Sequence, residues 1–347
     1  MKYKDLENEW SRHWFQFIKD NPDKDWRWWY ICRNENLTWK IISDNPDKPW
    51  NWEYLSGNPN ITMENIQQNL DKEWNWVEVS QNPHITWEFI QEYIDKDWHW
   101  YQLSMHPNVT WKIIQDNPDK DWDWNCISAN PNITWEIIQQ NPDKSWDWGG
   151  ISRNTNITWE IIQDNPDKDW CWYHLSMHPN LIWEIIQQYP DENWYWYYIS
   201  KHSNITWEII QDNSDKPWDW EGISINPNIT WEIIQQYPDK EWDWEVISDH
   251  PDVTWEIIQQ NPDKPWNGNW FSENPNITWE IIRDNPDTLW NWEDISENTM
   301  ELGKKRWLNQ RRLEHIKALQ IQRHWRNCSC NPQFKLAQRC LLRLHGS

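Results

Sequence analysis

The chain has 347 residues and a formal net charge of −23, and Trp accounts for 39 residues while Gly accounts for only 7. No run of 18 or more apolar residues occurs and the first ten residues are charged, so we expect neither a membrane span nor a secretory signal. The scarcity of glycine excludes glycine-rich phosphate loops, and no motif of a nucleotide-binding enzyme, zinc protease or serine hydrolase is present, so the sequence predicts no enzyme activity and no cofactor.

After a lead-in over residues 1–14, a tandem repeat fills residues 15–300. Between Trp26 and Trp290 the pattern recurs every 24 positions without insertion or deletion, and residues 130–153 give one unit, NPNITWEIIQQNPDKSWDWGGISR. The first Trp of the unit is replaced only once, by Met63. A fixed period of this kind predicts about twelve units, each of which contacts only its neighbours.

The first half of each unit predicts a short helix. Thr134 precedes the run WEIIQQ, and a Thr hydroxyl at this place can accept a hydrogen bond from a first-turn amide. Ile137 and Ile138 give an apolar stripe at helical spacing, and the Ile138 position is Ile in every unit from Ile18 to Ile282. Pro142 then ends the helix.

The second half predicts another short helix, of α or 3₁₀ type, capped by the Asp of the NPDK segment at Asp143. Trp146 and Trp148 lie about 200° apart on such a helix, so we expect one to pack within the unit and the other between units. The sequence therefore predicts an all-α solenoid of about twelve 24-residue units, with a contour of ~100 Å and a curved or superhelical path. The segment WNGNW moves the second Trp to Trp270 and is expected to disturb one unit.

Residues 301–347 differ from the array in charge and are predicted to form a basic helical cap. From Gly303 onward eleven Lys and Arg face one acid, Glu314, which gives +10 and leaves −33 for the rest of the chain. This separation of charge favours basic partners for the acidic array and anionic partners for the basic tail. Alternatively, the acidic array and the basic tail engage each other. Apolar faces for the cap are expected from two sets of residues: Leu313, Ile316 and Leu319, and further along Phe334, Ala337, Leu341 and Leu344.

The tail also contains candidate contact residues. Ile321, Gln322 and Arg326 match the opening of an IQ motif, a basic helix gripped by calmodulin-like proteins, and Trp325 lies beside them. The match is lost at Asn327 and Asn331. Alternatively the basic residues and Trp325 could contact nucleic acid without sequence specificity. The tail cysteines lack paired CxxC spacing, so no metal site is predicted.

Within the array, the two residues after each Trp-x-Trp vary most from unit to unit, and aromatic residues are frequent among them. Exposed Tyr residues are favoured at protein interfaces, so this ridge is the candidate contact face. The alternative interpretation is surface drift or extra packing between units. The candidate partner-binding residues here are Tyr54, Tyr101, Tyr173, His174, Tyr197 and Tyr198.

The unit NP-x-x-T-W-E-I-I-Q-x-N-P-D-K-x-W-x-W-x-x-I-S resembles the tryptophan-rich tandem repeats of uncharacterised giant DNA virus proteins of the mimivirus type. The resemblance covers about residues 15–300, and residues 321–343 resemble a C-terminal segment of giant-virus proteins. It implies the cytoplasm or nucleus of an infected host cell, or the virion, and carries no activity with it. The unit is also similar to leucine-rich variant repeats, which pair an α-helix with a 3₁₀ helix, and this serves as fold analogy.

Together these features predict a non-catalytic scaffold for protein–protein interaction, with no membrane association and a partner that is basic or extended. Acid pairs such as Asp143 and Asp147 recur in nearly every unit, which favours a structural role over a catalytic one. Two alternatives stay open. One is a virion structural component that self-associates, and the other is an acidic decoy that mimics nucleic acid and captures basic proteins. The sequence does not fix the oligomeric state.

Overall fold

The computed structural model describes residues 3–268 and 270–330, with the backbone alone at Trp270 and residues 325–330. This part of the chain contains 25 α-helices and no strand, as an α-solenoid requires. The outer helices are α1 (Tyr3–Asp20), α3 (Trp39–Asp44), α5 (Met63–Gln67), α7 (Trp87–Glu92), α9 (Trp111–Asp116), α11 (Trp135–Gln140), α13 (Trp159–Asp164), α15 (Trp183–Gln188), α17 (Trp207–Asp212), α19 (Trp231–Gln236), α21 (Trp255–Gln260) and α23 (Trp279–Asp284). The inner helices are α2 (Trp28–Arg33), α4 (Trp52–Leu55), α6 (Trp76–Val79), α8 (Trp100–Met105), α10 (Trp124–Ala129), α12 (Trp148–Arg153), α14 (Trp172–Leu175), α16 (Trp196–Ser200), α18 (Trp220–Ile225), α20 (Trp244–Ile247), α22 (Trp270–Glu273) and α24 (Trp292–Glu297). The last helix is α25 (Glu301–Cys330).

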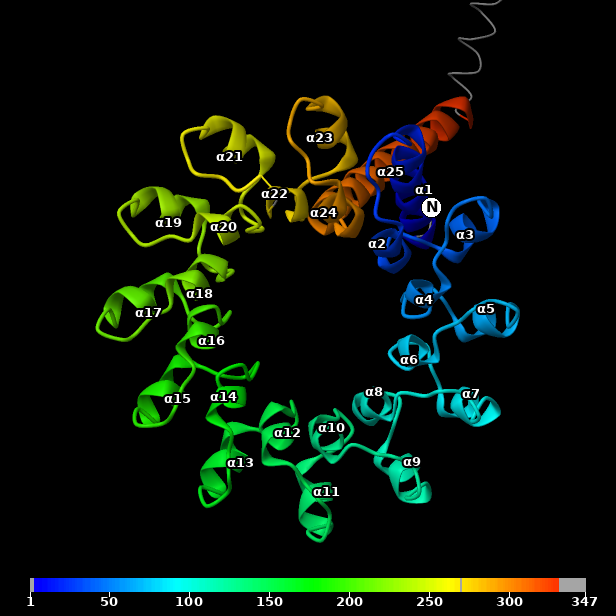
Figure 1. Ribbon diagram of the computed structural model, residues 1–347. Coiled ribbons are helices and arrows are strands. Elements are labelled where there is room, and N and C mark those ends of the chain that lie inside the picture. The colour runs from blue at the N-terminus through cyan, green and yellow to red at the C-terminus, as the bar shows by residue number, and fades with distance from the viewer. Residues whose placement is uncertain (1–2, 269, 331–347) are drawn as a thin grey trace, which may run out of the picture.

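The twelve units close into a ring (Figure 1). Even-numbered helices form the inner tier, odd-numbered helices form the outer tier, and α2 packs directly against α24. The predicted solenoid is thus present, but its path is a closed circle in which the first and last units are neighbours. No ribbon crosses the centre of the ring.

The outer helices follow the sequence prediction. Thr134 caps α11, because its hydroxyl accepts a hydrogen bond from the Ile137 amide, and α11 ends at Gln140, before Pro142. Ile182 stands at the Thr position of α15 and makes no such bond. The Ile138 position is buried in all twelve units, from Ile18 to Ile282. Helices of only six residues are not stable alone, so the buried side chains between neighbouring units stabilise them.

The predicted start of the second helix is wrong. The NPDK segment forms a turn, in which the Lys144 amide donates to the Asn141 carbonyl, and α12 begins only at Trp148. The cap is Asp147, between the two Trp residues, whose carboxylate accepts from the Gly150 amide. Asn and Asp favour both turns and helix caps, and here the earlier Asp143 belongs to a turn while the later Asp147 is the cap.

The Trp residues form clusters that bridge units. One Trp of each pair was expected to pack within its unit and the other between units, but Trp148 contacts Trp135 of its own unit and Trp170 of the next, and Trp146 contacts Trp124 of the preceding unit. Trp135 and Trp148 of one unit meet Trp170 of the next, with ring centroids 6.4 Å apart within the unit and 5.1 Å apart between Trp148 and Trp170. The same arrangement joins Trp231, Trp244 and Trp266. Edge-to-face aromatic pairs of this kind add ~0.5–1.5 kcal/mol each beyond the burial of their area.

A ladder of buried polar side chains also links each unit to the one before it. Asn154 donates to three carbonyls of the preceding unit, at distances of 3.0, 3.2 and 2.9 Å, and accepts from the Asn156 amide. Four units carry His in place of this Asn: His106, His178, His202 and His250. A second ladder runs from the backbone amide between the two Trp residues to a Ser hydroxyl 19 residues earlier, as from Asp147 to Ser128.

The seam between the last and first units repeats these contacts in register. The Arg27 amide donates to the Ser296 hydroxyl at 3.1 Å, and Asn34 donates to the carbonyls of Ser296 and Asn298. Within the array the Ser acceptor lies 19 positions before the amide, which for Arg27 would be position 8. Ser296 lies twelve periods of 24 residues after position 8, so it is the equivalent residue of the last unit. Trp26 meets Trp292 edge to face at 5.0 Å, as Trp148 meets Trp170.

Helices α1 and α25 clasp the seam from outside the repeat pattern. Trp10 is fully buried, its ring lies 4.0 Å from that of Trp279 and 5.6 Å from that of Trp307, and its indole N–H donates to Asn36. The chain turns from the ring into α25 at Met300, a buried residue with φ of 54°, in the left-handed region that non-glycine residues rarely adopt. The two ends of the chain therefore lie against each other, through tryptophan rings and one ion pair between Arg311 and Glu9 at 3.6 Å.

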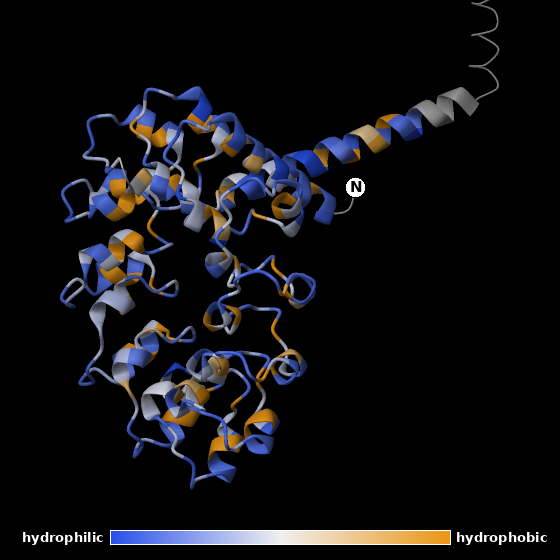
Figure 2. Cartoon of the chain, turned by 45° about the vertical axis from the view of Figure 1, so that its right-hand side comes forward, coloured by the Kyte–Doolittle hydropathy of each residue, from blue (hydrophilic) through white to orange (hydrophobic). Residues whose placement is uncertain are grey.

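Only the beginning of α25 acts as a cap. Leu308 is buried, and the amides of Leu302 and Gly303 donate to the Pro275 carbonyl. Beyond this point α25 projects away from the ring (Figure 2). The first half of the predicted apolar face of the cap is wrong, because its residues are solvent-exposed: Leu313 by 53%, Ile316 by 42% and Leu319 by 46%. The second half, predicted within residues 334–344, lies outside the part of the chain that the structure describes.

The predicted local disturbance at WNGNW is present. Helix α22 begins at Trp270, whereas the repeat would start it at residue 268, which is Gly here. Phe271 takes the place of the missing indole, with its ring 5.8 Å from Trp255 and 5.6 Å from Trp290. The cluster that bridges the two units is thereby kept.

Candidate functional site

The inner face of the ring carries most of the residues that differ between units. The inner helices bury the fourth and fifth positions, as at Ile151 and Ser152, and also the third position where it is small, as at Gly150 and Cys126. A Cβ atom at Gly150 would meet the Asn125 carbonyl of the preceding inner helix, so the third position faces the neighbouring unit. The second position lies about 200° round from the buried fourth position, toward the centre of the ring. Of the variable pair predicted as a contact face, the second position is therefore on the inside of the ring and the third lies between neighbouring inner helices.

The first aromatic cluster, formed by Trp29, Tyr30, Arg33 and Tyr54, lies on α2 and α4. Trp29 stacks on Tyr30 with ring centroids 4.0 Å apart and lies 5.7 Å from Tyr54. The Arg33 guanidinium sits 4.7 Å over the Tyr54 ring and pairs with Glu78 at 3.2 Å. Sequence reasoning identified Tyr54 but missed its neighbours, although Trp29 and Tyr30 are the equivalent pair of the first unit.

The second aromatic cluster, formed by Tyr173, Tyr195, Tyr197, Tyr198 and Lys201, lies on α14, on α16 and on the residues directly before and after α16. The Tyr173 and Tyr198 hydroxyls are 3.1 Å apart, and the Tyr173 ring also lies 5.1 Å from Tyr195. The Lys201 ammonium sits over both Tyr197 and Tyr198, at 4.7 and 4.9 Å. A cation therefore already lies against this aromatic surface.

The two clusters lie on opposite sides of the ring. Tyr54 and Tyr198 are 144 residues apart, which is six periods of 24, and six units are half of a twelve-unit circle. The sequence places both residues at the same position of the repeat, but only closure of the ring makes them face each other.

The remaining predicted contact residues are dispersed. Tyr101 is 45% exposed on α8 and makes a ring contact only with His99 among the described aromatic pairs. His174 is half-buried beside Tyr173, and burial lowers its pKa, with a further contribution from Arg153. Ile321 and Gln322 are exposed on the projecting part of α25, away from the inner face. The side chains of Trp325 and Arg326 lie outside the described part of the chain.

An acidic arc occupies the inner face of the last four units and was missed in the sequence. The segments 219–225, 243–249, 267–273 and 291–297 contain no Lys or Arg. The other eight inner segments hold four acids and four basic residues, so their net charge is zero. The nine acids of the arc are Asp219, Glu221, Asp243, Glu245, Asp249, Glu273, Glu293, Asp294 and Glu297. A comparison of the charged residues in equivalent segments of the twelve units would have identified this arc from the sequence.

The acidic arc lies between the two aromatic clusters. The second cluster precedes it along the chain, and the first cluster follows it across the seam, where Arg27 pairs with Glu293 at 3.6 Å. Eight of the twelve inner helices, from α14 across the seam to α4, thus carry an aromatic cluster, the acidic arc and a second aromatic cluster in that order. This surface is continuous only because the ring is closed.

Burial, with a smaller contribution from neighbouring acids, raises the pKa of three carboxylates in the arc. Burial, with the nearby Glu273 charge, raises the pKa of Asp249 to about 7, and one oxygen of Asp249 is buried without a hydrogen-bond partner. Burial and the neighbouring acids also raise the pKa of Glu273 and of Asp294. At neutral pH the arc therefore holds negative charge at a cost to folding, which a bound cationic group would reduce.

We predict that Asp249→Asn stabilises the ring in a pH-dependent way. Because the folded pKa of Asp249 is raised, its ionised form opposes folding, and this cost is fully present above about pH 7 and falls away as pH decreases toward the unfolded value near ~4. The gain should be about 1–2 kcal/mol at pH 8, reduced from the full shift because the side chain is partly solvated. Thermal melts at pH 8 and pH 5 measure it, and an equal gain at both values would contradict the pKa.

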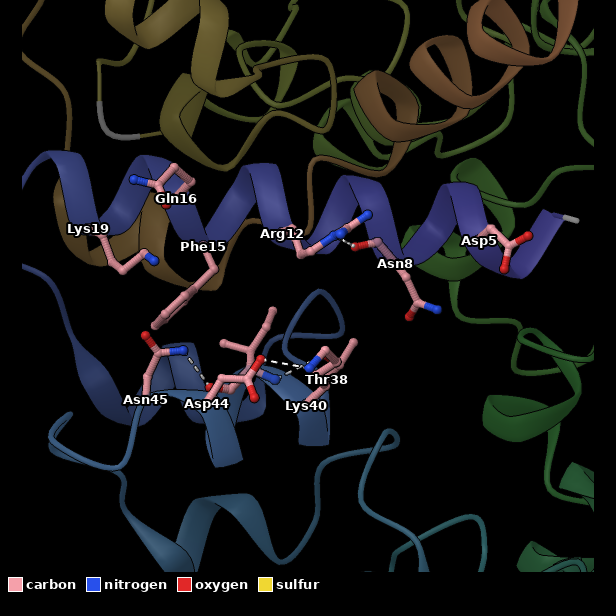
Figure 3. Close-up of a pocket in the computed structure, with 11 residues that line it drawn as sticks. Asp5, Asn8, Arg12, Phe15, Gln16, Lys19, Thr38, Lys40, Asp44 and Asn45 are labelled. Atoms are coloured by element: carbon pink, nitrogen blue, oxygen red, sulfur yellow. Dashed lines mark hydrogen bonds and ion pairs between the residues drawn. The ribbon is translucent and has the colours of Figure 1, made fainter. Parts of the chain in front are cut away.

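The other cavities and grooves of the described surface are weaker candidates for a specific binding site. A cavity of about 660 Å³ lies between α1 and α3 (Figure 3), but its charged residues are satisfied locally: Lys40 pairs with Asp44 at 2.9 Å and Arg12 donates to the Asn8 carbonyl. Grooves of about 580 and 480 Å³ recur between outer units in the same register, starting at Trp183 and Trp207. Such grooves repeat the framework and do not distinguish one unit from another.

Among the side chains that the structure describes, which do not include those of residues 325–330, no group of three His, Cys, Asp or Glu could hold a metal ion. None of the described helices is long and apolar enough to cross a membrane. Comparison of the chain with protein-family models, with curated proteins and with solved structures finds no match.

Proposed function

We propose that this chain is a non-catalytic, ring-shaped scaffold that binds a basic segment of a partner protein on its inner face. The observation that carries the proposal is the acidic arc with an aromatic cluster at each end. Acidic and aromatic groups together favour Lys- and Arg-containing segments, through ion pairs and cation–π contacts. The resemblance to giant-virus repeats suggests an infected cell or a virion as the setting.

Several weak contacts arranged in register support binding of an extended ligand. Each ion pair at a solvated surface contributes only ~0.2–1 kcal/mol, so affinity must come from engagement of several units together. The aromatic clusters would contribute the part of the affinity that salt does not screen. Binding of this kind predicts strong but incomplete salt dependence.

Fluorescence anisotropy with labelled octa-arginine and with an alternating Arg/Leu peptide tests this function. Glu221→Lys with Glu297→Lys, both exposed in the arc, should weaken binding about tenfold or more, since two attractions become repulsions. The matched control reverses Glu88 and Glu184, exposed on outer helices, and should change binding less than about twofold. Tyr173→Ala with Tyr198→Ala should remove the salt-resistant part.

Equal weakening by the inner and outer reversals would show that the peptides respond to net charge alone. Absence of binding at low salt to the unaltered ring would overturn the proposed function.

A further inference from the structure

The part of α25 that projects from the ring, residues 309–324, is an exposed helical arm. Four basic residues and one acid give it a charge of +3, counted as Arg311, Arg312, Lys317 and Arg323 against Glu314. Of these residues only His315 is not fully in the exposed class. Arg311 stands at the base of the arm, where it also pairs with Glu9 of α1 at 3.6 Å. The arm has a charge opposite to that of the ring, and its apolar side chains remain in water. A group of exposed apolar side chains on one element is typical of an interaction surface.

One face of the arm mixes aliphatic and basic residues. With Leu313 taken as 0°, Ile316 and Leu319 lie at about 300° and 240°, and Arg312 and Arg323 lie between them at about 260° and 280°. A bilayer surface or a simple apolar groove favours segregated faces. A surface that carries acids next to aromatic rings matches the arm better. The inner face of this ring is such a surface, because the acidic arc has an aromatic cluster at each end.

The arm cannot reach the inner face of its own ring. Helix α25 runs without interruption from Glu301 to Cys330, a length of ~45 Å, and its first turns are fixed at the seam by Leu308 and Trp307. From there it points away from the ring (Figure 2). Any contact between arm and acidic arc must therefore form between two molecules.

The size of the ring permits this contact. Twelve inner helices spaced 8–10 Å apart give a circumference of ~100–120 Å, and subtraction of the helix radius leaves an opening of roughly 20–28 Å. An α-helix with its side chains is ~10–12 Å wide, so it fits inside with room for contact on one side. Contact on one side suits an acidic arc that covers four of the twelve units.

We propose that the arm of one molecule docks on the acidic arc and aromatic clusters of a second copy, so that molecules associate arm to ring. This inference rests on the proposed function, because it names the chain's own arm as a ligand of the inner face. The contact is heterologous, so it extends into chains of molecules unless the geometry closes them into a small ring. The association should weaken with salt and strengthen with protein concentration.

Analytical ultracentrifugation of the full chain at ~100 mM and ~500 mM salt tests the proposal. We expect concentration-dependent association at the lower salt that is lost in Arg312→Glu with Arg323→Glu, and a weakening of at least tenfold. Lys40→Glu with Lys112→Glu, on exposed outer-helix positions, changes the net charge equally and should leave association within about twofold. Circular dichroism confirms that each variant is folded.

A charge swap identifies the acceptor. Arc variant Glu221→Lys with Glu297→Lys should not associate alone but should associate when mixed with the reversed-arm variant. Rescue in this mixture supports docking on the arc, and its absence, or a full chain that stays monomeric at low salt, overturns the inference.

A labelled peptide of residues 309–324 separates the two proposals. If this peptide fails to bind a chain that ends at Arg312 while octa-arginine binds it, the inference fails and the proposed function stands. If neither binds, both fail. Binding of the arm to lipid vesicles or nucleic acid, without binding to the ring, also overturns the inference.

Discussion

Replacement of Trp10 by alanine is expected to open the ring. Trp10 is fully buried at the seam, where it contacts Trp279 and Trp307 and donates to Asn36, so the substitution leaves a large cavity and an unpaired acceptor. Removal of a buried Trp costs ~3–5 kcal/mol. The contacts that α2 and its flanking residues make with the last unit must then resist the separation of the first and last units. Small-angle X-ray scattering should show a larger radius of gyration and loss of the ring profile.

Trp231→Ala provides the matched control, because Trp231 is also a buried outer-helix Trp but lies within the array. Its loss should lower stability by a similar amount while the scattering profile keeps the shape of a ring. Trp10→Phe should keep the ring with a smaller loss of stability. A folded Trp10→Ala variant with unchanged scattering would show that α1 does not hold the seam.

Replacement of Asn154 by alanine is expected to destabilise the junction between two units by about 2–4 kcal/mol. Three carbonyls lose their shared donor and the Asn156 amide loses its acceptor, all in a region without solvent. Urea denaturation followed by tryptophan fluorescence measures the loss. Asn154→His is the control supplied by the chain itself, since four units use His here, and it should cost less than ~1 kcal/mol at pH 8. Equal losses in both variants would rule out the ladder as the cause.

The same ladder predicts sensitivity to acid. The His106 Nδ1 accepts from the Asn108 amide and its Nε2 lies 3.2 Å from the Asn82 carbonyl, which requires the neutral ring protonated at Nε2. Burial lowers the pKa of His106, His178, His202 and His250. Their contribution to stability is therefore present above the unfolded value near ~6.5 and is lost as pH falls through the lower folded values.

Substitution of these four His residues by Asn should remove much of the loss of stability between pH 7 and pH 5. Melting temperatures of the unaltered chain and the fourfold variant across this range provide the comparison. Parallel curves would show that the His positions do not control acid stability.

Sequence reasoning predicted the units well because their information is local. The Thr cap, the buried Ile138 position and the break at Pro142 each act within six residues, and all three are present in the structure. The start of the second helix was placed at Asp143 instead of Asp147 because Asp stabilises turns and caps alike. The shifted Trp270 was recognised as a disturbance, but its replacement by Phe271 depends on packing across units.

Closure could not be predicted, because it depends on the small rotation between neighbouring units. The same 24-residue pattern is compatible with an open superhelix or a circle, and a few degrees per unit decide between them. Trp10, which stands where later units have the ladder Asn, marks the first unit as different. The contact face was predicted by variability, but the opposition of Tyr54 and Tyr198 and the continuity of the acidic arc follow from closure alone.

Closure also makes the number of repeats a discrete quantity. An open solenoid gains or loses units by duplication or deletion within its gene, and each change leaves the remaining junctions as they were. Here each of the twelve units accounts for one twelfth of a full turn, about 30°, so a ring of eleven or thirteen would require about 33° or 28° at every junction. The bend of a single junction thus restricts how many units the ring can contain.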